Sequence, residues 1–173
     1  MSSSGCSPTG IPYCITDERR EWMALFLDKL AISSPDITAL ERFPYEFTAD
    51  GGNSVPRLEF SGAPEGTVEY AIICHDPDAP LPHGFTHWVV YGVSPDASSL
   101  DTDAEGVRVA PNGAGFPIYY GPEPPVGHGL HHYYFWIYAL SRPVEGEPSR
   151  EEFLERYGDA VIEQARFVAV WSR

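Results

Sequence analysis

The chain has 173 residues, about the size of one domain, and 43% of them are hydrophobic and 13% aromatic. Its 25 acidic and 11 basic residues give a formal net charge of -14, which repels phosphate backbones and anionic lipid surfaces. Nucleic acid and stable membrane association are therefore not expected, and no apolar run approaches the roughly 20 residues that span a bilayer. The 16 Gly and 17 Pro, together with the aromatic content, predict a mainly β protein with many turns.

Residues 1–16 are predicted to form a flexible tail, because Ser, Gly, Thr and Pro are frequent there and no periodicity is present. The segment lacks a basic region followed by an apolar core, so we expect no secretory signal and a cytoplasmic location. Residues 17–173 are expected to form a single domain, since no internal repeat or linker divides them.

A helix is predicted at the start of that domain, where Asp17 precedes the run ERREWMALFLDKLAI. Its large apolar side chains recur near helical spacing: Trp22, Leu25, Phe26 and Leu30. An amphipathic helix of this kind packs either against its own domain or against a second copy of the chain, and the pattern slightly favours a homodimer.

Short strands separated by Pro and Gly turns are predicted from residue 43 to residue 140, a pattern typical of a sandwich or barrel. Three strands are especially rich in aromatic and β-branched residues: Val68–His75, Thr86–Val93 and His131–Leu140.

Near the end of the chain the period changes from that of a strand to that of a helix. Ser149 and Glu152 have the spacing of a capping box, and Gly158 ends the helix that they begin. A second short helix is expected from Asp159 to Ala165, followed by a final strand in RFVAVWSR.

The histidines are concentrated in one part of the sequence, among the turn-rich runs DPDAP, APNGAG and GPEPPVGHG. All 6 fall between residues 75 and 132: His75, His83, His87, His128, His131 and His132. Histidine transfers protons near neutral pH and binds anions or metals, so the cluster marks a candidate functional site.

The run DPDAP has two interpretations. As a turn, each Asp accepts a hydrogen bond from a downstream backbone N–H, and the prolines stiffen the chain. As part of a site, Pro77 and Pro80 fix the carboxylate of Asp76 or Asp78 at the mouth of a strand, preorganised for a ligand. The two interpretations can hold for different Asp residues.

Strand alternation assigns the histidines to faces of the sheet. It places His87 with Val89 on one face of the strand HWVVYGV, and in HHYYFWIYAL it places His131 with Tyr133. His132 then points to the opposite face, so the two adjacent histidines cannot line one pocket together. Taken alone, His87 is more simply explained as a satisfied structural residue.

No metal or cofactor is expected. The diverging His131 and His132 argue against a compact metal site, and no His-x-His, HExxH or CxxC spacing is present. The cysteines, Cys6, Cys14 and Cys74, are odd in number and lack metal-ligand spacing, and Cys74 is predicted to be a small buried residue in a strand.

Two runs of the sequence resemble a known family. Residues 53–93, NSVPRLEFSGAPEGTVEYAIICHDPDAPLPHGFTHWVVYGV, and residues 121–140, GPEPPVGHGLHHYYFWIYAL, are similar to the phosphatidylethanolamine-binding protein family, especially its bacterial and archaeal branch. The resemblance implies a mainly β fold with a central antiparallel sheet, a smaller sheet and short C-terminal helices. The predicted N-terminal helix is an addition to that pattern.

The resemblance also implies a small pocket that binds anions such as phosphate head groups. Motif by motif, its ligand-binding residues carry over to Asp76, Pro77, Asp78, His87, Pro125, His131 and Tyr133. The sequence departs from the family pattern at His132, where an Arg usually stands, at Glu123, often Cys in the bacterial branch, and at Phe60, usually Trp. The missing Arg weakens the expectation of plain phosphate binding.

Two functions fit this pocket. The first is a small-ligand binding protein for an anionic or oxygen-rich molecule. The second is an enzyme in which Asp76, His87, His131 and Tyr133 supply a general acid and base for dehydration, cyclisation or isomerisation of a small organic substrate, for instance in natural-product biosynthesis. Inhibition of proteases or kinases is implied by the resemblance alone, since the sequence offers no contact motif for it.

Overall fold

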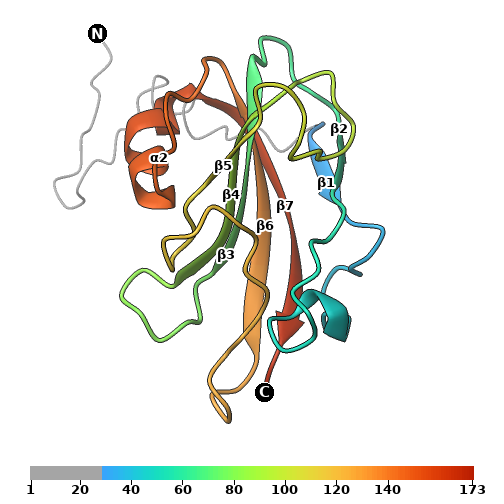
Figure 1. Cartoon of the computed structure of the whole chain (residues 1–173). Helices are drawn as coiled ribbons and strands as arrows, with labels where there is room; N and C mark the ends of the chain where they lie inside the picture. The colour runs from blue at the N-terminus through green and yellow to red at the C-terminus, as the bar shows by residue number, and fades with distance from the viewer. Residues whose placement is uncertain (1–28) are drawn as a thin grey trace, which may run out of the picture.

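The computed structural model describes residues 29–173, in which two antiparallel sheets and one α-helix are arranged in layers (Figure 1). The five-stranded central sheet has the order β5-β4-β3-β6-β7, and the small sheet pairs β1 with β2. The strands are β1 (Ala31–Ser33), β2 (Glu59–Ser61), β3 (Glu69–Asp76), β4 (Phe85–Val93), β5 (Arg108–Ala110), β6 (His131–Leu140) and β7 (Val161–Trp171). The helices are α2 (Arg150–Tyr157) and two 3-10 turns, η1 (Tyr45–Phe47) and η2 (Gly158–Ala160).

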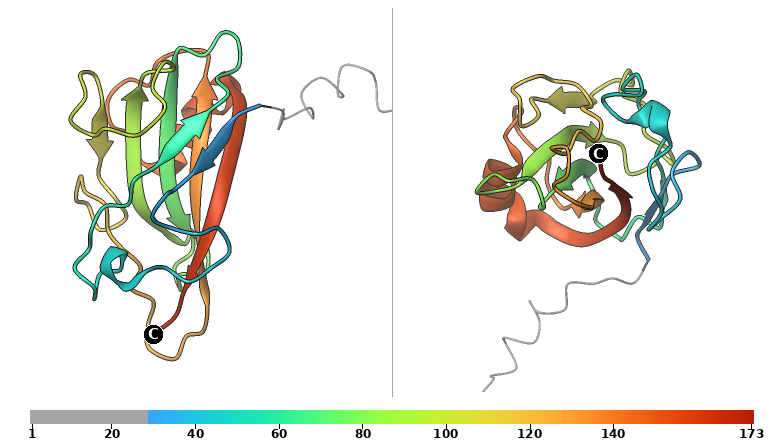
Figure 2. Two further views of the ribbon diagram at one scale, coloured as in Figure 1. Left: turned by 90° about the vertical axis from the view of Figure 1, so that its right-hand side faces the viewer. Right: turned by 90° about the horizontal axis from the view of Figure 1, so that it is seen from below.

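The central sheet is covered on both faces. On one face its side chains pack against β1 and β2 through Ile32 and Phe60, and the small sheet crosses in front of the central strands (Figure 2). On the other face they pack against α2 through Phe153 and Tyr157. The middle strand β3 is buried along its whole length, as expected of a strand covered on both sides.

The predicted fold class is confirmed: the protein is mainly β, with a central antiparallel sheet and a smaller one. The capping box is present too, because Ser149 Oγ accepts from the backbone N–H of Glu152 while the Glu152 side chain accepts from the N–H of Ser149. Cys74 is buried in β3, as predicted.

The predicted second helix from Asp159 to Ala165 is wrong. Only the single 3-10 turn η2 follows α2, and β7 begins at Val161. The residues from Val161 onward pair with β6, with Ala165 opposite Ile137, so sheet pairing outweighs the local helix propensity. The predicted N-terminal helix lies outside the described residues except at its end, where Ala31 already belongs to β1.

Antiparallel pairing brings the candidate site residues to one end of the central sheet. β3 ends there at Asp76, while β4 begins at Phe85 and β6 begins at His131. Asp76 pairs directly with Phe85, and His75 pairs with Tyr134. Segments distant in sequence therefore meet at this end through strand direction alone.

A β-bulge in β4 changes the face on which His87 lies. β3 pairs Cys74 with Trp88 but His75 with Thr86, which leaves His87 as the extra residue of β4. The expectation that His87 shares a face with Val89 is therefore wrong.

The bulge turns His87 toward the face that carries the start of β6. Its ring lies edge-on to Tyr133 at 5.0 Å between centroids, and Tyr133 belongs to the core beneath the small sheet. Val89 belongs to the opposite core, beneath α2. In β6 the predicted alternation holds, since His131 and Tyr133 are buried and His132 is half-exposed on the other side.

No helix within residues 29–173 is long and apolar enough to cross a membrane.

We predict that Phe153→Ala lowers the free energy of unfolding by about 3–5 kcal/mol, because Phe153 is 0% exposed and joins α2 to the central sheet. Leu154 is the matched control on the same helix. It is 38% exposed, and Leu154→Ala should cost less than about 1 kcal/mol. Urea unfolding followed by circular dichroism measures both, and equal losses would contradict the packing of α2 described here.

Candidate functional site

A cavity of about 470 Å³ opens at the end of the central sheet where β3 ends and β6 begins. Its polar lining consists of Asp76, His87, Tyr120, Glu123, His131 and Tyr133. Its apolar lining consists of Ala79, Pro80, Leu81, Phe85, Ala114, Phe116, Pro124 and Pro125. The volume lies in the range of small-molecule sites, and the few polar groups within apolar walls are typical of them.

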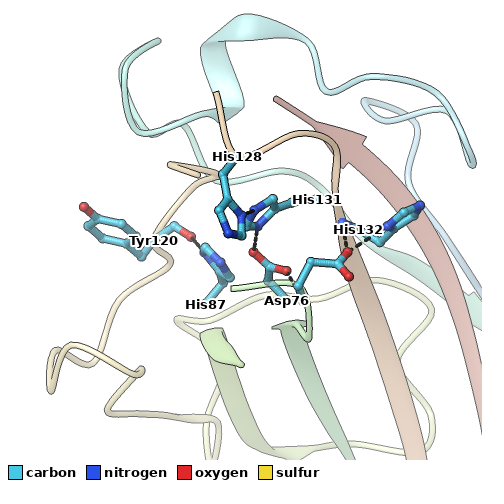
Figure 3. A network of polar contacts seen from close by, with 7 residues as sticks. Asp76, His87, Tyr120, His128, His131 and His132 are labelled. Atoms are coloured by element: carbon cyan, nitrogen blue, oxygen red, sulfur yellow. Dashed lines mark hydrogen bonds and ion pairs between the residues drawn. The ribbon is translucent and has the colours of Figure 1, made fainter. Parts of the chain in front are cut away.

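A row of hydrogen bonds runs from the base of this cavity outward (Figure 3). The carboxylate oxygen Oδ2 of Asp76 accepts from His131 Nδ1 at 2.7 Å, and both side chains are almost fully buried. His131 Nε2 lies 2.8 Å from Nδ1 of the exposed His128. Burial raises the pKa of Asp76, and the hydrogen bond from His131 offsets only part of that shift.

The turn after β3 holds the second oxygen of Asp76. Oδ1 accepts from the backbone N–H of Asp78 at 2.8 Å, which closes a local turn. Gly84 lets the same loop fold back onto the strand end, because a Cβ there would lie 2.3 Å from the carbonyl oxygen of Asp76 and its φ is +66°. The carboxylate is thus fixed from two directions.

His87 is held in one tautomer. Its Nδ1 lies 2.6 Å from the carbonyl oxygen of Tyr120, which can only accept, so Nδ1 carries the proton. The backbone N–H of Tyr120 in turn donates to the carbonyl of His87 at 2.9 Å. Burial lowers the pKa of His87 to about 4, so near neutral pH the ring is uncharged and Nε2 is an acceptor.

Tyr133 lines the cavity and carries a buried hydroxyl. The side chain is 1% exposed, and its hydroxyl has no hydrogen-bond partner within residues 29–173. Burial raises the pKa of Tyr133 above its ordinary value, so the phenol keeps its proton. An unpaired buried hydroxyl costs free energy, so Tyr133 lowers the stability of this end of the sheet.

The outer rim is held by ionic contacts. The Tyr120 hydroxyl donates to Glu123, whose other oxygen lies 3.3 Å from Nη1 of Arg173. Arg173 also contacts Asp50 at 2.9 Å through Nε. Its guanidinium is thus shared between two carboxylates, and the hydrogen bond to Glu123 raises the pKa of Tyr120.

The structure brings together most of the predicted site residues. Asp76, His87, His131, Tyr133 and Pro125 all line the one cavity. Pro77 and Asp78 do not line it. Asp78 instead accepts hydrogen bonds from the backbone N–H and Nδ1 of His132, at 2.9 and 2.8 Å, on the outside of the site.

Tyr120, Phe85 and Phe116 are among the cavity residues that the sequence analysis did not identify. Tyr120 holds His87 through its carbonyl oxygen, a role that leaves no trace in the residue type. Phe85 and Phe116 form apolar walls, and their only sequence signal is an aromatic residue next to the Gly-rich turns. Within the described part of the chain, no group of three or more His, Cys, Asp or Glu side chains is placed to hold a metal ion.

The family assignment follows from comparison with known proteins. The sequence model described as phosphatidylethanolamine-binding protein matches residues 33–172. The chain belongs to this family. The matched region contains the whole central sheet, β2 and every residue of the cavity.

Relatives and solved structures agree with this assignment. A UPF0098 protein of Methanothermobacter thermautotrophicus is 35% identical over 141 residues, which cover 76% of this chain and 91% of the relative. The crystal structure of YbcL from E. coli, described as a member of the mammalian PEBP family, matches with a TM-score of 0.78 and 28% identity, and covers 84% of this chain and 99% of YbcL.

One relative bears on location. A Mycobacterium tuberculosis protein that is 34% identical over 149 residues, covering 83% of this chain and 73% of its own length, is named a putative lipoprotein, LppC. Family membership therefore does not fix a cellular compartment, and the cytoplasmic location stays a prediction.

We predict that His87 makes the protein less stable in acid. Its pKa is about 4 in the folded state against an ordinary 6.5, so below pH 6.5 the unfolded chain takes up a proton that the folded protein does not. Stability attributable to His87 is present above pH 6.5 and is lost as the pH falls toward 4, by at most about 3 kcal/mol.

Urea unfolding of the wild type and His87→Phe between pH 7 and pH 4 tests this prediction. The variant should lose less stability over that range, since phenylalanine keeps the ring but does not titrate. The pKa of Asp76 is raised in the folded state, so Asp76 changes the stability in the opposite direction as the pH falls. Both proteins contain Asp76, so its contribution cancels in the comparison. The control is His83→Gln at an exposed position, which should follow the wild type. Parallel curves for wild type and His87→Phe would contradict the prediction.

Proposed function

We propose that the protein binds a small oxygen-containing ligand in the cavity at the end of the central sheet. The observation that carries this proposal is the cavity of about 470 Å³ itself, which His87 lines with its Nδ1 bonded to the carbonyl of Tyr120 and its Nε2 without a hydrogen-bond partner within residues 29–173.

The surroundings support binding by a preformed site. Asp76 and His131 are locked by mutual hydrogen bonding, and His87 is locked by Tyr120, so little side-chain entropy remains to be lost when a ligand enters. The exposed side chains of Leu81 and Phe116 stand at the entrance, where they can cover an apolar ligand.

The test is a titration of the isotope-labelled protein by NMR with a panel of phosphate, acetate and phenol. We expect at least one compound to shift the backbone amide resonances of Asp76, His87, Tyr120 and His131. His87→Ala should lower the affinity for that compound about tenfold or more, as expected for the loss of one buried hydrogen bond.

A second variant tests the cavity in case His87→Ala does not fold. Phe116→Ala changes a side chain that is 58% exposed, so it should weaken binding without changing the unfolding transition. Val68→Ala is the matched control, at a 49% exposed position before β3 and far along the strand from Asp76. If no compound shifts the cavity resonances, or if all variants bind alike, the cavity is not the site.

Catalysis is a second candidate, and the hydrogen-bonded row Asp76–His131–His128 favours it. A buried carboxylate that orients an imidazole, which is linked to a second imidazole at the surface, can pass a proton between ligand and solvent. Such a row suits dehydration, cyclisation or isomerisation, in which a proton leaves one atom of the substrate and joins another.

The catalytic candidate predicts proton exchange with solvent at a bound ligand. Acetophenone incubated with the protein in D2O should exchange its methyl protons faster than in buffer, as followed by NMR. Asp76→Asn keeps the shape of the side chain and should slow this exchange by about 10²–10⁴-fold. If the methyl protons exchange in the presence of the wild-type protein only as fast as in buffer, the protein does not abstract a proton from this ketone.

A further inference from the structure

The helix α2 covers only part of the sheet face on which it lies. Among the described residues, the core beneath α2 draws its sheet side chains from β3, β4, β5 and the end of β6, whereas β7 adds only the partly buried Val161. Two cross-strand pairs of β6 and β7 lie further along this same face, because the residues between them belong to the core beneath the small sheet. These pairs, which we call the aromatic strip, are Tyr134 with Val168 and Trp136 with Arg166.

The aromatic strip presents large side chains that water still reaches. Tyr134, Trp136 and Val168 are half-buried, and Arg166 is exposed. The rings of Tyr134 and Trp136 stack at 6.3 Å between centroids, and the guanidinium of Arg166 lies over both, at 5.2 and 4.7 Å. In the part of the chain that the structure describes, the one further ring contact of this pair is with Tyr138, the next residue on this face of β6. An apolar sheet surface left open in this way is a candidate interaction surface.

The chain that leads into β1 is tethered next to this strip. The backbone N–H groups of Lys29 and Leu30 both donate to Oε1 of Glu163, at 2.8 and 2.7 Å. Glu163 lies on β7, three residues before Arg166, and β7 is the last strand of the central sheet. The segment that precedes Lys29 in the sequence is thus held at the strand that carries half of the strip, with only the edge of β7 to pass around.

Residues 17–28 have the sequence pattern of a segment that packs through one side. Trp22, Leu25 and Phe26 recur at the spacing of one side of a helix. Glu18 stands four residues before Trp22 and seven before Leu25, so a carboxylate borders that same side. An apolar side bordered by a carboxylate is complementary to aromatic rings bordered by the guanidinium of Arg166.

The lengths of the segment and the strip also agree. A helix from Glu18 to Lys29 would be about 16 Å long, and the five steps along β7 from Glu163 to Val168 span about 17 Å. Because Lys29 is already held at β7, docking within the chain closes only a short loop, whereas a second copy would have to be captured from solution.

We propose that residues 17–28 dock as a helix on the aromatic strip of the same chain, with their apolar side against the rings of Tyr134 and Trp136. This interface extends the layer formed by α2 across β6 and β7. It is separate from the proposed function, because no residue of the strip is among the described residues that line the cavity.

NMR of the isotope-labelled 173-residue chain, at a concentration where sedimentation shows a monomer, tests the proposal. We expect nuclear Overhauser contacts from the side chains of residues 22–26 to the rings of Tyr134 and Trp136, and slow amide hydrogen exchange from residue 21 to residue 28. Contacts that appear only between labelled and unlabelled chains in a mixed sample would assign the strip to a second copy and overturn the proposal. It is also overturned if the amides of the segment exchange as fast as those of an unfolded peptide.

A matched pair of tryptophans identifies the surface. Trp136→Ala should speed exchange in residues 21–28 about tenfold or more, since it removes a buried aromatic contact. Trp171→Ala is the control, because Trp171 is also half-buried and has Arg42 over its ring at 4.8 Å, but it packs against the core beneath the small sheet. It should leave this exchange unchanged, and an equal effect of the two variants would rule out the strip as the docking surface.

Arg166 supplies a second variant in case Trp136→Ala does not fold. Arg166→Glu changes an exposed side chain and should speed exchange in residues 21–28 severalfold, because it places a carboxylate where the segment brings its own. Arg166→Lys keeps the positive charge and should have a smaller effect. Exchange in Arg166→Glu as slow as in the wild type would contradict docking on the strip.

Discussion

The structure at the cavity end of the central sheet depends on the buried carboxylate of Asp76. A carboxylate out of water has to be hydrogen-bonded, and here the donors come from two separate parts of the chain, Asp78 in the following turn and His131 at the start of β6. Satisfying this one group fixes the path of the turn and the rotamer of His131, and it places His128 at the far side of the imidazole. The same burial that makes the carboxylate costly also raises its pKa and makes it useful for proton sharing.

The second constraint is geometric and lies in β4. A regular strand would carry His87 toward α2, away from His131 and Tyr133, and the bulge reverses this. Bulges are common beside functional sites, where they re-aim a side chain while they bend the strand and interrupt the ladder locally. Tyr120 then completes the arrangement, since its N–H and carbonyl both bond to His87 and hold the ring at a fixed angle.

Much of this arrangement could be predicted from the sequence, and the failures have identifiable causes. Histidine clustering pointed to the end of the central sheet where the cavity lies, and period-two alternation correctly separated His131 and Tyr133 from His132, because β6 is regular at those residues. Alternation failed at His87, since no Gly or Pro in THWVV marks the extra residue of the bulge. The sequence also could not tell which Asp of DPDAP enters the cavity, because the two occupy similar local settings and differ only in their contacts with β6. Likewise, local spacing predicted a helix at 159–165, where pairing with β6 imposes a strand.

The bulge has a consequence for how this protein can change over time. Deletion of His87, the one residue between Thr86 and Trp88, would remove this bulge from the β3–β4 ladder and take the imidazole out of the cavity in a single step. Replacing Tyr133 by Phe would likewise remove an unpaired buried hydroxyl and raise the stability of the fold. At both positions a regular, fully paired structure would be more stable, and natural proteins keep such irregular features mainly at functional sites.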